Sequence, residues 1–123
     1  MAEGLLVTRR LGERKPITTE ATYPEAVDLS EPAVTWWQRR LGTDEWHISA
    51  GTATVTDISE SKGQPAGTVW EHRYAPSAAA VGTPGRYACH FRQDYGPTGD
   101  EQYRYVPDEG GEIRLVVVEQ PVA

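Results

Sequence analysis

Short stretches of alternating apolar and polar residues, separated by turn-forming glycines and prolines, run along the whole chain. In residues 87–92 the side chains of Tyr87, Cys89 and Phe91 fall on one face, which is the period of two of a β-strand. Residues 113–118 alternate in the same way. The pattern predicts strands near 5–10, 16–22, 33–40, 52–58, 67–74, 86–95, 101–106 and 112–119.

Helical patterns are almost missing from the chain. Residues 76–81, a proline followed by Ser, three Ala and Val, have room for one or two turns before Gly82, so a short helical crossover is expected there. Residues 59–66 are polar and contain Gly63 and Pro65, which predicts a loop at a hairpin tip. Turn signals at roughly 8–12-residue spacing between short strands are typical of a sandwich or barrel. The sequence therefore predicts an all-β fold.

The amino-acid composition indicates which interactions can stabilise this fold. The chain has 123 residues, which suits a single domain over 1–123, and its single cysteine can form no internal disulfide. Four Trp and six Tyr residues offset an apolar fraction of only 38 %, because each aromatic ring buries a large area. No apolar run approaches the roughly 20 residues of a membrane-spanning helix, and the first residues do not resemble a secretory signal. No contact with a membrane is expected.

The net charge and its distribution limit the kinds of molecule that the chain is expected to bind. The net charge of −6 argues against nucleic-acid binding as the main activity, because such proteins usually carry a basic face. Residues 1–15 are locally basic and form an N-terminal arm or edge strand, with Arg9, Arg10, Arg14 and Lys15 as candidate partner-binding residues. This segment is suited to docking on an acidic neighbouring subunit. An ordinary strand with a solvated polar face is the alternative.

The residues that could carry chemistry do not form a reactive site. Cys89 and His90 are adjacent on a predicted strand, so their side chains point to opposite faces and cannot act as nucleophile and base. The histidines at 47, 72 and 90 lack the close spacing of a zinc site. The acidic residues near the two late loops are Asp94, Asp100, Glu101, Asp108 and Glu109. They lack the spacing of a calcium loop. We expect no catalytic residue, no metal and no cofactor, and hence no enzyme.

The aromatic residues carry more information. Trp36 and Trp37 are neighbours on one predicted strand, so one of them faces away from the core. Tyr103 and Tyr105 share a face of another strand. Exposed aromatic residues are enriched at protein interfaces, so all four are candidate partner-binding residues. The alternative is that they cover a thin core from its edges.

Residues 85–89 read Gly-Arg-Tyr-Ala-Cys, the G-x-Y-x-C pattern of the late strand of immunoglobulin domains. The resemblance implies that the Tyr87 hydroxyl bonds back to the main chain near residues 80–84, and that Trp36 is the matching core tryptophan. The first cysteine of that pattern is absent. The implied fold is an immunoglobulin-like antiparallel β-sandwich of about seven to eight strands without a disulfide.

A second resemblance covers nearly the whole chain. The order of short motifs is similar to that in the Ig-like domains of phage tails, especially the N-terminal domain of the baseplate upper protein family. The motifs lie at 6–10, 27–36, 67–70, 85–87, 94–96, 105–110 and 113–117. Two features depart from that family: the chain ends at Ala123 without a stalk or receptor-binding segment, and it has Pro32 where such domains usually have Gly.

This second resemblance implies a structural protein of the virion, made in the cytoplasm of a bacterial host. It would be a small subunit of the tail or baseplate, assembled with other phage structural proteins and with further copies of itself. Two alternatives stay open. One is decoration of the capsid, and the other is a module that binds a carbohydrate or host surface, such as a surface glycan, through exposed aromatics.

Overall fold

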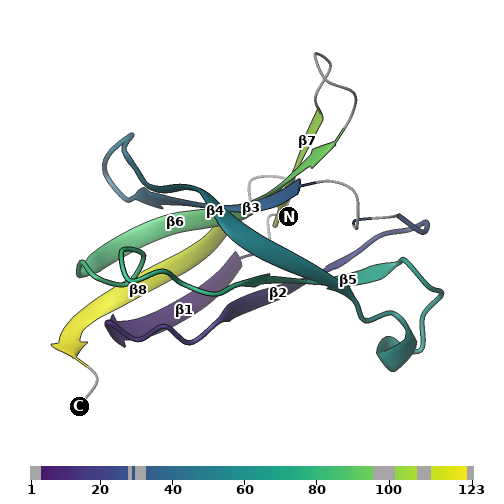
Figure 1. Ribbon diagram of the computed structural model, residues 1–123, viewed down its shortest axis with the longest axis horizontal. Coiled ribbons are helices and arrows are strands. Elements are labelled where there is room, and N and C mark those ends of the chain that lie inside the picture. The colour runs from purple at the N-terminus through teal and green to yellow at the C-terminus, as the bar shows by residue number, and fades with distance from the viewer. Residues whose placement is uncertain (1–3, 28, 30–32, 96–101, 108–111, 122–123) are drawn as a thin grey trace.

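The computed structural model describes residues 4–27, 29, 33–95, 102–107 and 112–121. These residues form eight β-strands and one 3₁₀ turn, and none of them lies in an α-helix (Figure 1). The all-β prediction and the expected number of strands are confirmed. The elements are β1 (Gly4–Leu11), β2 (Ile17–Thr22), β3 (Ala33–Arg40), β4 (Trp46–Asp57), η1 (Glu60–Lys62), β5 (Val69–Tyr74), β6 (Gly85–Tyr95), β7 (Gln102–Val106) and β8 (Glu112–Pro121).

The strands form one mixed sheet that is nearly closed into a barrel. Their order is β1-β8-β6-β3-β4-β5-β2, and β7 pairs with β6 beyond the part of β6 that pairs with β8. Strand β1 runs parallel to β8, whereas every other pair in the described residues is antiparallel. The fold was predicted to be antiparallel, and the sheet departs from this prediction at the β1–β8 pair. Parallel strands need a long connection, and here almost the whole chain supplies it.

Strand β4 is longer than predicted and serves two parts of the sheet. Its first half pairs with β3 and its second half with β5. Within the half that pairs with β3 the register is irregular, Ala50 has a positive φ of 52°, and a Cβ on Gly51 would lie 3.1 Å from side-chain atoms of both Ile48 and Tyr74. The glycine therefore allows the strand to pack closely against the core. The sequence pattern missed residues 46–51 because this irregular stretch breaks the alternation.

The helical crossover expected at 76–81 is wrong, because this segment is a series of turns. Its carbonyl groups accept hydrogen bonds from other parts of the chain instead of continuing a helix. The carbonyl oxygen of Ala80 accepts from the Gln38 side chain at 2.9 Å, and that of Val81 accepts from the main-chain N–H of Gly12 at 2.8 Å. The segment thus joins β3 to the turn that follows β1. The polar loop predicted at 59–66 is confirmed and contains η1.

The core lies between the inward faces of the strands. Trp36 is completely buried at its centre, where it stacks on Tyr74 with ring centroids 4.7 Å apart and meets Phe91 edge-on at 5.1 Å. The Tyr87 hydroxyl donates a 2.7 Å hydrogen bond to the carbonyl of Thr83, as the sequence pattern predicted. Tyr87, Cys89 and Phe91, which alternation placed on one face of their strand, are all buried, and so are Leu115 and Val117 of the alternating stretch 113–118.

Candidate binding surface

The basic residues singled out in the sequence lie around the turn between β1 and β2. The Arg9 guanidinium donates to the carbonyls of Lys15 (3.1 Å) and Pro16 (2.9 Å), and that of Arg14 donates to the carbonyl of Pro76 at 2.8 Å. These two side chains therefore hold neighbouring segments of the fold together. The side chains of Arg10 and Lys15 are exposed.

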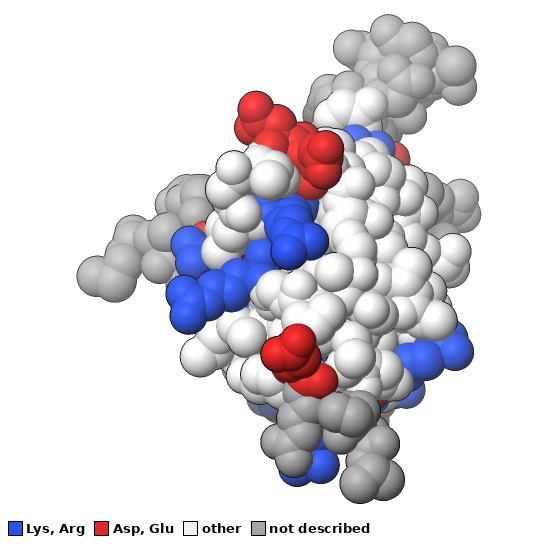
Figure 2. All heavy atoms as spheres, turned by 90° about the vertical axis from the view of Figure 1, so that its left-hand side faces the viewer, with Lys and Arg blue, Asp and Glu red and all other residues white. Residues whose placement is uncertain are grey.

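Figure 2 shows the end of the molecule that carries this turn. The Lys and Arg side chains form several separate groups there, with acidic groups between them. They do not merge into one continuous basic patch on this face. Residues 4–11 are not a free arm either, because they form edge strand β1 and pair with β8.

The aromatic residues, in contrast, gather on the outer face of four strands. One ring comes from each strand: Trp46 from β4, Trp37 from β3, His90 from β6 and Tyr105 from β7. Trp37 meets Trp46 at 5.2 Å between ring centroids, Trp46 meets His90 at 5.8 Å, and His90 meets Tyr105 at 5.0 Å. We call these four rings, with Arg92 and Tyr103, the aromatic face.

Strand alternation and register together build this face. Because Trp36 and Phe91 point into the core, their neighbours Trp37 and His90 must point outward. The register places Trp37 opposite His90, and β7 brings its tyrosines beside the same part of β6. Alternation along each strand determines which side chains face outward. The pairing of neighbouring strands determines that these side chains contact one another.

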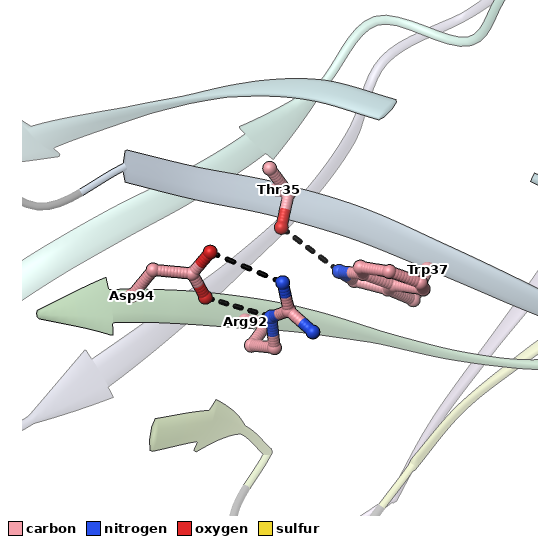
Figure 3. Close-up of polar contacts among 4 residues, drawn as sticks. All are labelled: Thr35, Trp37, Arg92 and Asp94. Atoms are coloured by element: carbon pink, nitrogen blue, oxygen red, sulfur yellow. Dashed lines mark hydrogen bonds and ion pairs between the residues drawn. The ribbon is translucent and has the colours of Figure 1, made fainter. Parts of the chain in front are cut away.

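Arg92 lies at the centre of the face, between two rings. Its guanidinium carbon is 4.4 Å from the ring centroid of Trp37 and 4.4 Å from that of Tyr103. Its Nε and one terminal nitrogen bind the two Asp94 carboxylate oxygens at 2.7 and 3.1 Å (Figure 3). The indole N–H of Trp37 donates to the Thr35 hydroxyl at 2.8 Å. A bidentate ion pair and two stacked rings hold the guanidinium plane in a fixed orientation.

His90 contributes to this face as an uncharged ring. Burial, together with the nearby positive charges of Arg92 and Arg39, lowers the pKa of His90 from 6.5 to about 4. Cys89 points to the opposite side of β6, and its burial, with a smaller contribution from Glu112, raises the pKa of the thiol. At neutral pH the Cys89 thiol is therefore protonated, and the His90 ring, on the opposite face of the strand, cannot reach it to remove the proton.

Three rings of the face are open to a partner. Trp46 is 45 % exposed, Tyr103 49 % and Tyr105 44 %, whereas Trp37 is half-buried beneath its neighbours. Trp36 has no exposed surface, so it cannot contact a partner. Of the candidates chosen from the sequence, the structure brings together Trp37, Tyr103 and Tyr105. The basic residues around the turn between β1 and β2 are not part of this group.

Sequence reasoning missed three members of this face. Trp46 falls in a stretch that was not expected to be a strand, His90 was considered only for chemistry, and Arg92 was not singled out. Alternation on β6 places residues 90 and 92 on the outer face, next to the outward-facing aromatic residue of β3. This signal could have found His90 and Arg92.

Other kinds of site find no support in the described residues. Among them, no three His, Cys, Asp or Glu side chains lie close enough to hold a metal ion. Asp100, Glu101, Asp108 and Glu109 lie outside the described residues. The part of the chain that the structure describes also contains no helix with the length and hydrophobicity needed to cross a membrane. No protein-family model matches the chain, and no curated protein matches it.

Proposed function

We propose that this chain is a non-catalytic assembly subunit that binds another protein through its aromatic face. The observation that carries the proposal is the row of partly exposed rings around a fixed Arg92. Tryptophan, tyrosine and arginine are the residues most enriched in the energetic centres of protein interfaces. A guanidinium and rings that are already held in place lose little side-chain entropy on binding, which favours affinity.

The ring geometry favours a protein partner over a glycan. A sugar stacks on the open face of an aromatic ring. Here the Arg92 guanidinium lies over the rings of Trp37 and Tyr103, and Trp46 and His90 meet edge to face, so part of the ring surface is already covered. A fixed guanidinium among partly exposed rings suits the mixed side chains of another protein.

The immunoglobulin-like assignment belongs to the same proposal. It is supported by the hydrogen bond from Tyr87 to Thr83, by the core position of Trp36, and by the pairing of the late strand β6 with both β3 and β8. With the order of motifs in the sequence, it supports a place in a phage tail or baseplate. The partners would then be other structural proteins of the particle and further copies of this chain.

The test is incorporation into particles. The first step is mass spectrometry of purified virions from the phage that encodes the chain. The second step compares Trp46→Ala with Leu6→Ala, because Leu6 is a 72 % exposed apolar residue of β1 outside the aromatic face. We expect Trp46→Ala to reduce incorporation at least about tenfold, as for a central interface tryptophan, and Leu6→Ala to assemble normally.

Three results would refute the proposed function. The first is absence of the protein from virions, and the second is equal incorporation of the two variants. The third is saturable binding of a glycan that Trp46→Ala abolishes while assembly is unchanged, which would favour a carbohydrate-binding module. Thermal unfolding of both variants checks that each is folded.

A further inference from the structure

The nearly closed sheet has one open seam, between its two end strands. Strands β1 and β2 end the strand order, and no pairing joins them in the described residues. At one end of the seam the Arg9 side chain reaches from β1 to the carbonyls of Lys15 and Pro16, just before β2. The opposite end has no such closure and opens into a groove.

This groove has a volume of about 790 Å³, within the range of roughly 300–1,000 Å³ that is typical of ligand sites. Leu5 of β1 lines it on one side, Ala21 and Thr22 of β2 on the other, and Val106 of β7 lies between them in the lining. Glu25 also contributes to the wall. The lining thus combines apolar side chains with polar and charged ones, among them Arg104 and Tyr105.

The edge of β2 that faces this seam pairs with no other strand of the described residues. The Tyr23 N–H donates to the carbonyl of Thr68, in continuation of the β2–β5 register. In an antiparallel pair only alternate residues bond to a given neighbour, so the odd-numbered residues of β2 bond to β5. The N–H and C=O groups of Thr18, Glu20 and Thr22 therefore point the other way. The described residues offer no second strand partner for β2.

We propose that this seam accepts an extended segment of a partner polypeptide, which adds as a strand to the free edge of β2. Alternating backbone donors and acceptors along an edge are matched best by another extended backbone. The bound segment would carry apolar side chains at every second position, directed toward Leu5, Ala21 and Val106. The groove adjoins the aromatic face at Tyr105, which belongs to both surfaces.

The test uses peptide display, because the natural segment is not identified. A random library of nine-residue peptides is selected on the purified full chain, and the dissociation constants of the selected peptides are measured. We expect sequences with apolar residues at alternate positions. On binding, amide hydrogen exchange should slow at Thr18, Glu20 and Thr22, whose N–H groups point into the seam.

A proline substitution separates backbone pairing from side-chain contact. Glu20→Pro removes one seam-facing N–H and no hydrogen bond to β5, while Glu20→Ala keeps that N–H. Both variants lose the Lys62–Glu20 ion pair equally, so the comparison isolates the backbone. We expect the dissociation constant to rise about tenfold or more for Glu20→Pro, and to stay within about twofold of wild type for Glu20→Ala. Thr22→Pro replaces Glu20→Pro if the latter does not fold.

Several results would overturn the strand site while leaving the proposed function untouched. These are the selection of no peptide, equal affinity of the proline and alanine variants, or unchanged amide exchange at the three positions. Loss of peptide binding in Trp46→Ala would place the peptide on the aromatic face instead. Self-association of the chain that Glu20→Pro abolishes would identify a second copy as the occupant, in place of a partner segment.

Discussion

Acidification should destabilise the fold through His72. The side chain is completely buried, its Nε2 accepts a hydrogen bond from the Gln93 amide at 2.8 Å, and its ring packs on Phe91 at 5.6 Å. Burial lowers the pKa of His72 from 6.5 to about 4, so the imidazole is neutral at pH 7. A proton added to this site would place an unpaired charge in the core.

The sign and size of the effect follow from linkage. Between pH 6.5 and about 4 the unfolded chain binds a proton at His72 that the folded chain does not. The stabilising contribution is therefore fully present above pH 6.5, falls as the pH decreases, and is lost below about pH 4. At about 1.4 kcal/mol per unit, the whole pKa difference corresponds to about 3 kcal/mol, of which about 2 kcal/mol is lost between pH 7 and 4.5.

The assay is urea unfolding at pH 7 and pH 4.5 for wild type, His72→Phe and His90→Phe. Wild type should lose at least about 2 kcal/mol of unfolding free energy. His72→Phe keeps a ring beside Phe91 but cannot titrate, so its loss should be smaller by about that amount. The pKa of His90 is lowered to about 4 as well, so His90→Phe should also reduce the pH dependence, and the double variant should lose both contributions. An NMR titration that gives His72 a pKa near 6.5, or an unchanged pH dependence in His72→Phe, would refute the reasoning.

Three further substitutions test the packing of the fold. Cys89→Ser should lower the unfolding free energy by about 1–3 kcal/mol, because it buries a poorly paired hydroxyl, and native Cys89 should react slowly with thiol reagents; rapid labelling would show that the thiol is accessible. Tyr87→Phe should cost about 1 kcal/mol in urea unfolding by removing the hydrogen bond to Thr83, and a neutral result would mean that this bond contributes nothing. Gly51→Ala should lower the thermal midpoint, since its Cβ would press on Ile48 and Tyr74 at 3.1 Å; an unchanged midpoint would show that β4 moves away without cost.

Local alternation predicted which side chains enter the core. Tyr87, Cys89 and Phe91 are buried because neighbouring residues of a strand point to opposite faces, and this period can be read within a few residues. The same rule required one of Trp36 and Trp37 to face outward. The sequence alone left open which one, because both are large aromatic residues and the rest of their strand suits either face.

Tertiary structure decided what depends on contacts between distant residues. The parallel pairing of β1 with β8 and the close packing of Gly51 against Tyr74 depend on neighbours far along the chain, and no local period encodes strand direction. The aromatic face joins residues 37, 46, 90 and 105 only through the order of four strands. The open seam exists because the two end strands of the sheet, β1 and β2, do not pair with each other in the described residues. The sequence thus determined the face of each strand, and strand pairing determined which of those faces became a surface that can bind.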